Sequence, residues 1–339
     1  MKKVPDPLAA LGFQAPNPTW QAPEVTGLGR LPMRAPLQPF ADRDAAIRGD
    51  AEASPFRLSL DGTWRFLRVD APGAAPPDFQ APGFDDAAWA GLEVPTSWAL
   101  QGFGAPAYTN VLMPFAEDPP RVPEKNPTGL FRRRFRVPAA WRGRRTTLSI
   151  GSAESVVYVW LNGVPVGLGK DSRLASEFDL TPHLVEGENL LALAVVQFSD
   201  ATWLEDQDQW WLPGLHRSVV LVSSAPTFVE DVALRAEPGE APGTGRVSAE
   251  VTVGSSAVLM PGHRVDVELV DGRGRRLGEA KGAEVPVFRR GSEMIELVSG
   301  FLYPGPVARV AFDVAGIRRW SHEDPALYRA IVTLRDPAG

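Results

Sequence analysis

The chain has 339 residues and a mass of 36.7 kDa, enough for two domains that each bury their own core. Its net charge of −6 argues against a nucleic-acid partner, because binding to a phosphate backbone favours a basic surface. The absence of cysteine excludes disulfides and thiolate chemistry. No run approaches the ~20 apolar residues of a membrane helix, and prolines replace the apolar stretch of a secretory signal near the start. These features predict a cytoplasmic protein without a membrane partner.

Proline, glycine and tryptophan are frequent, with 33, 32 and 10 copies. A turn-rich composition with many aromatic side chains favours short strands over long helices. Residues 1–56 contain many prolines and show no sustained hydrophobic period. We therefore expect this segment to be an extended arm that lies on another surface.

Residues 57–224 predict an all-β domain with the short strands of a jelly roll. In the first strand, Trp64 and Phe66 alternate with arginines, as a half-buried strand requires. A tight hairpin is expected at Asn162 and Gly163, because this pair readily adopts positive φ angles. The one helix expected is a turn near 181–185, with Thr181 as its cap. The predicted strands are 63–69, 130–137, 145–150, 155–162, 164–168, 189–198 and 217–223.

Residues 225–339 predict a second, immunoglobulin-like β-sandwich, which we expect to be truncated at its C-terminal end. The tryptophans nearly disappear here, and the stretches 237–245 and 271–278 are expected to be exposed connections. The predicted strands are 228–236, 246–254, 264–270, 292–298, 307–314 and 327–335.

Several common kinds of site are excluded by spacing. The four histidines are too isolated to match a zinc motif. The Gly-x-Gly at 167–169 follows a hairpin strand and does not open a helix, so it does not predict a phosphate loop. No Gly-x-Ser-x-Gly nucleophile elbow occurs.

The densest polar cluster is the segment 199–211, which holds four carboxylates and three tryptophans. Tryptophan faces stack on sugar rings while carboxylates take hydroxyl groups, so carbohydrate contact is one interpretation, and binding of a hard cation is another. The structural alternative is that the tryptophans plug the end of the sandwich. Burying one indole removes ~150–250 Å² from water, worth roughly 4–6 kcal/mol at ~25 cal/mol per Å².

A second polar stretch, 98–129, forms a long proline-stiffened excursion between strands. Within it, the amide of Asn110 offers two donors and an acceptor, which suits the recognition of sugar hydroxyls. A role as a turn residue is the alternative for Asn110.

Six motifs follow one another along the chain. They are Leu-Asp-Gly-Thr-Trp-Arg-Phe at 60–66, Val-Pro-Thr-Ser-Trp at 94–98, Tyr-Thr-Asn-Val at 108–111, Glu-Lys-Asn-Pro-Thr-Gly at 124–129, the ten residues 171–180, and Leu-Glu-Asp-Gln-Asp at 204–208. In this order they resemble the sugar-binding jelly-roll domain of glycoside hydrolase family 2 β-galactosidases. The arm segment 20–36 resembles the region before that domain, and 320–329 resembles a late strand of the family's first immunoglobulin-like domain. The resemblance is strongest from 57 to 223 and weak from 237 to 310.

The resemblance implies a retaining glycosidase, a hydrolase acting on terminal β-D-galactosides such as lactose. In the family, both catalytic glutamates sit on a (β/α)₈ barrel of ~250 residues that follows these two domains. We therefore expect no catalytic residue in this chain and no activity of the chain alone. Its partners would be the galactoside and a catalytic barrel, in cis or in trans, with a homo-oligomer possible for the full-length enzyme.

By the same resemblance, the loop residues that reach the substrate pocket are Asn110 and Asp200. Asn110 would contact galactose hydroxyls, and Asp200 would contact galactose and a sodium ion shared with the sugar. The other sodium ligands and the magnesium ligands lie in the family's barrel, so no cofactor is expected in this chain by itself. Two alternative functions are a stand-alone carbohydrate-binding or scaffolding protein and a subunit that completes a glycosidase in trans.

Overall fold

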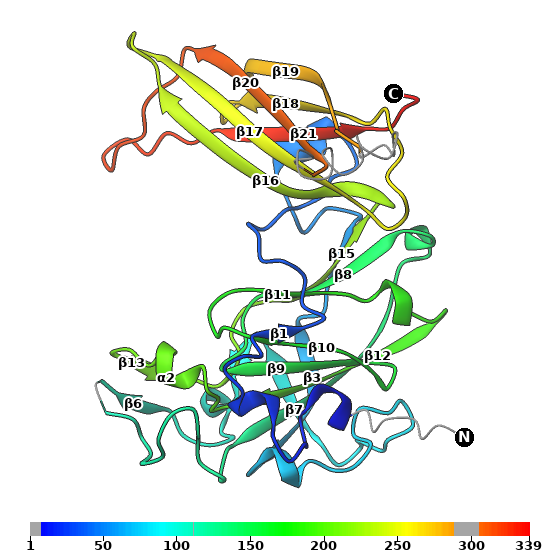
Figure 1. Ribbon diagram of the computed structural model, residues 1–339, viewed down its shortest axis with the longest axis vertical. Coiled ribbons are helices and arrows are strands. Elements are labelled where there is room, and N and C mark those ends of the chain that lie inside the picture. Colours follow the sequence, from blue (N-terminus) through cyan, green and yellow to red (C-terminus); the bar gives the residue numbers. More distant parts are fainter. Residues whose placement is uncertain (1–7, 111, 288–304) are drawn as a thin grey trace, which may run out of the picture. The chain divides into compact units, whose positions relative to one another are not determined.

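The computed structural model describes residues 8–110, 112–287 and 305–339 (Figure 1). The chain forms two compact units, one made of residues up to Met33 together with Arg57–Ser223, the other of Arg34–Phe56 and Ser224–Gly339. The segment expected to be a single arm is therefore shared between the units. In the described residues, no helix is long and apolar enough to cross a membrane. The predicted class, two all-β sandwiches in succession, is confirmed.

The first unit contains a seven-stranded antiparallel sheet and a four-stranded sheet. The order in the large sheet is β1 (Gly27–Leu28), β10 (Val164–Lys170), β9 (Val156–Leu161), β12 (Glu188–Val196), β7 (Thr128–Arg136), β3 (Gly62–Val69) and β4 (Ala90–Val94). The order in the small sheet is β11 (Ser176–Asp179), β8 (Arg145–Ile150), β15 (Val219–Ser224) and β2 (Arg57–Ser59).

The central strands β9 and β12 are buried on both faces, which explains their unbroken apolar sequences. Successive side chains of a strand point to opposite faces. Val157 accordingly joins the cluster that contains Leu221 of the small sheet. Its neighbour Tyr158 joins a different cluster with Phe13 and Trp20. The small sheet thus covers one face of the large sheet, and the N-terminal arm contributes the cover of the other.

The local predictions for the first unit are largely confirmed. Each predicted strand corresponds to an observed one, and the hairpin turn has φ 54° at Asn162 and 83° at Gly163. Near 181–185 the chain forms the single 3-10 turn η6 (Thr181–His183). Thr181, which was predicted to cap this turn, is its first residue, and Leu180 takes the cap position. The remaining 3-10 helices are η1 (Ala9–Leu11), η2 (Thr19–Gln21), η3 (Pro72–Ala74), η4 (Trp98–Gln101) and η5 (Ala139–Trp141).

The second unit is a sandwich of two three-stranded antiparallel sheets over a valine-rich core. One sheet has the order β16 (Thr227–Pro238), β17 (Thr244–Ser255), β20 (Val307–Ala315), and the other has β19 (Arg276–Glu284), β18 (Arg264–Val270), β21 (Arg329–Arg335). The unit also holds α1 (Arg43–Arg48), whose cap Asp42 accepts from the Ala45 N–H at 2.8 Å.

Two predictions for the second unit need comment. The stretch 271–278 was expected to be a connection, but β19 begins within it, since its backbone pairs with β18 despite the glycines. The strand predicted at 292–298 lies outside the described residues. The predicted domain boundaries at 57 and 225 remain predictions.

Candidate functional site

A small two-stranded sheet joins the two polar loops that the sequence singled out. Strand β6 (Ala107–Thr109) pairs with β13 (Gln209–Trp211), so that Trp210 lies opposite Tyr108. The indole N–H of Trp211 also donates to the Thr109 hydroxyl at 2.7 Å. Figure 1 shows β6, β13 and the short helix α2 (Thr202–Glu205) together at one end of the first unit. The pairing of β6 with β13 brings the stretch that contains Asn110 next to the tryptophan-rich segment.

Two of the three tryptophans of the segment are structural. Trp211 is buried and packs against Phe198 at 5.5 Å between ring centroids. Trp203 packs edge-on against Phe115 at 5.3 Å, and its indole N–H donates to the Arg121 carbonyl at 3.0 Å. For these two side chains the structure supports the interpretation as plugs of the domain end.

The third tryptophan belongs to an exposed aromatic pair. Trp210 is 57% exposed and contacts Tyr108, which is 51% exposed, with 5.7 Å between ring centroids. The Tyr108 hydroxyl donates to the carboxylate of Asp208. An exposed aromatic surface of this kind can contact a sugar ring or another protein surface.

The two predicted site residues lie in different environments. Asn110 follows β6 directly and is exposed. Asp200 follows β12, and its side chain is only 8% exposed. Its carboxylate oxygen Oδ1 lies 2.6 Å from the ammonium of Lys170. Burial raises the pKa of Asp200 above its ordinary value of 3.8, while the ammonium of Lys170 acts in the opposite direction.

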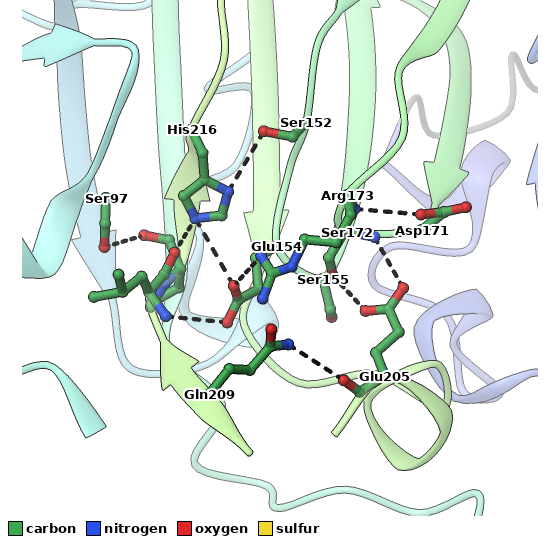
Figure 2. A network of polar contacts seen from close by, with 12 residues as sticks. Ser97, Ser152, Glu154, Ser155, Asp171, Ser172, Arg173, Glu205, Gln209 and His216 are labelled. Atoms are coloured by element: carbon green, nitrogen blue, oxygen red, sulfur yellow. Dashed lines mark hydrogen bonds and ion pairs between the residues drawn. The ribbon is translucent and has the colours of Figure 1, made fainter. Parts of the chain in front are cut away.

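A second buried carboxylate, Glu154, organises the neighbouring loops (Figure 2). Its side chain is 5% exposed and accepts from the guanidinium of Arg173 at 2.8 Å and from the Leu212 N–H at 3.2 Å. The Nε2 atom of His216 lies 3.8 Å from the same carboxylate. Glu154 therefore fastens the turn after β10 to the segment that leads into β14 (Gly214–Leu215).

Glu205 holds helix α2 against the same turn. Its carboxylate accepts from the backbone N–H of Ser172 at 2.9 Å and also from the Ser172 hydroxyl (Figure 2). Burial raises the pKa of Glu205, and the hydrogen bonds from Ser172 oppose that rise. The backbone carbonyl of Glu205 accepts from Gln209 at 3.5 Å.

A pocket lies between these groups. Its empty volume is about 270 Å³, which includes the space that opens to solvent. One oxygen of Asp206 is buried without a hydrogen-bond partner, and burial raises the pKa of this side chain. The pocket is lined by Glu154, Ser155, Ser172, Arg173, Thr202, Glu205, Asp206, Gln209, Trp210 and Trp211.

The structure also bears on cation binding. Within residues 8–110, 112–287 and 305–339, no three acidic, histidine or cysteine side chains are grouped so that they could hold a metal ion. Three of the four carboxylates of the 199–211 segment instead bind neighbouring side chains. Asp200 binds a lysine, Glu205 a serine and Asp208 a tyrosine.

Sequence reasoning missed Lys170, Glu154 and Arg173. Lys170 and Arg173 fall in or next to the Gly-x-Gly stretch that was set aside as unrelated to phosphate binding. A charged residue at the end of an otherwise buried strand was an available signal, because lysine is almost never fully buried without a partner. Glu154 carried no comparable signal.

The fold and these loops define a β-sandwich domain with buried ion pairs and an exposed aromatic pair at one end. Comparison with known families identifies its class. Residues 57–225 match the family described as glycosyl hydrolases family 2, sugar binding domain. Through this domain the chain belongs to glycosyl hydrolase family 2.

Full-length relatives are β-galactosidases. The chain is 36% identical over 323 residues to a β-galactosidase of Psychromonas ingrahamii and 34% identical over 320 residues to one of Vibrio cholerae. Each match covers 94% of this chain and 30% of the relative, so the chain spans about 30% of the length of these relatives, at their amino-terminal part.

Solved structures of family 2 enzymes share the fold. A β-glucuronidase of Bacteroides uniformis has a TM-score of 0.62 at 19% identity, covering 83% of this chain and 30% of that one. A β-glucuronidase of Bifidobacterium dentium, complexed with coumarin-3-O-glucuronide, has a TM-score of 0.61 at 19% identity, covering 85% and 46%.

Proposed function

We propose that this chain is the non-catalytic amino-terminal portion of a β-galactosidase that hydrolyses terminal β-D-galactosides by a retaining mechanism. Its loops 98–129 and 199–211 would line a substrate pocket completed by a catalytic barrel. The observation that carries the proposal is the match of 94% of the chain to 30% of each β-galactosidase relative. A cytoplasmic location and a homo-oligomeric full-length enzyme belong to the same proposal.

The engagement of the buried carboxylates supports a non-catalytic role. A retaining glycosidase needs two carboxyl groups about 5–5.5 Å apart, one of them free to attack the sugar. Here Glu154 and Asp200 form ion pairs, and Glu205 accepts two hydrogen bonds from Ser172. Each of these groups holds loop structure.

The exposed apolar side chains near β6 and β13 support docking of a barrel at this end. Leu112 is 74% exposed and Leu204 is 85% exposed, in addition to Tyr108 and Trp210. Large apolar side chains gathered on long loops mark a contact surface more often than a solvated one. A barrel that covers them would also bring its pocket to Asn110.

Within this proposal, Asn110 binds galactose hydroxyls through its side-chain amide, and Asp200 contributes a carboxylate oxygen to the sugar and to a sodium ion. The donor set fits sodium only in part, since Oδ1 of Asp200 is already paired with Lys170. This chain would supply one ligand, and residues outside it would supply the others. Magnesium would be held outside this chain.

Complementation tests the proposal. The purified chain is mixed with a β-galactosidase relative from which the matching amino-terminal 30% has been deleted, and hydrolysis of a chromogenic β-galactoside is measured in sodium and magnesium. We expect no turnover from either piece alone and turnover from the mixture, with Asn110→Ala reducing it. Turnover by the chain alone would overturn the non-catalytic assignment. Tight galactoside binding by the chain alone, without complementation, would favour a stand-alone carbohydrate-binding protein.

A further inference from the structure

Lys170 lies at the end of β10 with its ammonium in the interior of the first unit. The side chain is 6% exposed and faces the carboxylate of Asp200 at 2.6 Å. The same ammonium donates to the backbone carbonyl of Ala22 at 2.8 Å. One buried cation therefore contacts both the loop after β12 and the N-terminal arm.

Backbone hydrogen bonds tie the same arm segment to both partners. The Asp200 N–H donates to the Trp20 carbonyl at 3.0 Å, and the Lys170 N–H donates to the Thr26 carbonyl at 3.3 Å. Immediately afterwards, β1 pairs with β10 at the edge of the large sheet. The arm thus forms one wall of the environment of Asp200.

The orientation of Asp200 follows from these contacts. Oδ1 of Asp200 accepts the hydrogen bond from the ammonium of Lys170. The position of the ammonium is fixed by the Ala22 carbonyl as well as by Asp200, so the arm helps to set where the carboxylate lies. If one partner of such a pair is removed, the other stays buried and unpaired, which is strongly unfavourable.

We infer that Lys170 is a positioning residue that couples the N-terminal arm to Asp200. The arm thereby helps to hold the Asp200 carboxylate in place. The role of Asp200 in binding a ligand rests on the proposed function. The coupling itself rests on the contacts among Lys170, Ala22 and Asp200.

Amide hydrogen exchange at single-residue resolution on the full chain tests the coupling. The probes are the Asp200 N–H, bonded to Trp20, and the Val25 N–H, bonded to the Ala22 carbonyl at 2.9 Å. The Asn162 N–H, bonded to Leu190 in the same unit, is the internal reference. With Lys170→Met, we expect about 100-fold faster exchange at both probes, because the arm and Asp200 lose their shared partner, and no change at the reference. Unchanged exchange at both probes would overturn the inference.

Two further substitutions separate positioning by charge from simple packing. Lys170→Arg keeps the cation and is expected to restore protection at both probes. Lys170→Gln is one atom shorter and keeps a hydrogen-bond donor but not the charge, and it is expected to behave like Lys170→Met. Protection in Lys170→Gln equal to that of the unchanged chain would show that a neutral donor suffices and would overturn positioning by charge. Lys281→Met, at a lysine that is 60% exposed, is the matched control.

A reciprocal variant keeps the inference testable if Lys170→Met does not fold. Asp200→Asn is expected to speed exchange at Val25, which belongs to the arm, and an unchanged Val25 would count against coupling. None of these readouts involves a sugar or catalytic turnover. A failed complementation experiment would therefore reject the proposed function and leave the result on Lys170 standing.

Discussion

The guanidinium of Arg173 donates to the buried carboxylate of Glu154 at 2.8 Å, although the two residues lie in different loops of the first unit. The same carboxylate accepts from the Leu212 N–H. We expect Glu154→Ala to lower the free energy of unfolding of this unit by about 2 kcal/mol, because buried donors lose their acceptor. Chemical denaturation followed by tryptophan fluorescence measures the change.

A surface pair provides the control for that prediction. Glu186 binds Arg142 at 2.8 Å, but the two side chains are 88% and 80% exposed. Glu186→Ala should therefore cost less than about 1 kcal/mol. Equal losses for the two variants would mean that Glu154 contributes no more than an ordinary surface charge.

Glycine at position 167 should be required for docking of the arm. A Cβ atom there would lie 2.2 Å from the Leu28 carbonyl of β1 and 2.8 Å from the Phe178 ring. We expect Gly167→Ala to displace β1 and to destabilise the first unit by about 1–3 kcal/mol. Limited proteolysis should show faster cleavage within 20–33. Gly83→Ala, where a Cβ meets nothing within 4 Å, should leave both measurements unchanged.

Substitutions of the two adjacent tryptophans of β13 should have different effects, one on stability and the other on assembly with the barrel-containing piece. Trp211 is 7% exposed, so Trp211→Ala should cost about 3–5 kcal/mol of unfolding free energy through the cavity it leaves. Trp210 is 57% exposed, and Trp210→Ala should leave stability nearly unchanged while weakening complementation with the barrel-containing piece. Full complementation by Trp210→Ala would remove this surface from the proposed interface.

The pH dependence of stability should carry a contribution from Glu205. Burial raises the pKa of this carboxyl above its ordinary value of 4.5. A raised pKa means that the stabilising contribution is complete below pH 4.5 and is lost as the pH rises through the folded-state value. Glu205→Gln stays neutral, so its stability relative to the unchanged chain should increase between pH 4.5 and neutral pH. Denaturation midpoints across this range measure it.

Asp271 provides a contrast of opposite sign. Hydrogen bonds lower the pKa of Asp271 below its ordinary value of 3.8, and the largest effect comes from the backbone N–H of Arg275. Its stabilising contribution is therefore present above pH 3.8 and lost only as the pH falls through the lower folded-state value. Asp271→Asn should give a constant difference between pH 4.5 and 7. A similar pH trend in both variants would show that the trend does not come from Glu205.

Local sequence determined much of the architecture. The period-two alternation around Trp64 and the Asn162–Gly163 turn depend on neighbours along the chain, and both are observed as predicted. The motifs also placed residues 57–223 in the correct family. Short-range patterns suffice here because side-chain alternation and backbone φ preferences are properties of a few consecutive residues.

Tertiary structure alone decided the partners of the buried charges. Lys170 and Asp200 are separated by 30 residues, and Arg173 and Glu154 by 19. Nothing in the local sequence specifies that either pair meets. The same holds for β19, whose glycines indicate a loop until pairing with β18 overrides them. Whether a carboxylate is free for a ligand or already held by a cation depends on which distant segments pack together, because burial and charge pairing are set by the whole fold.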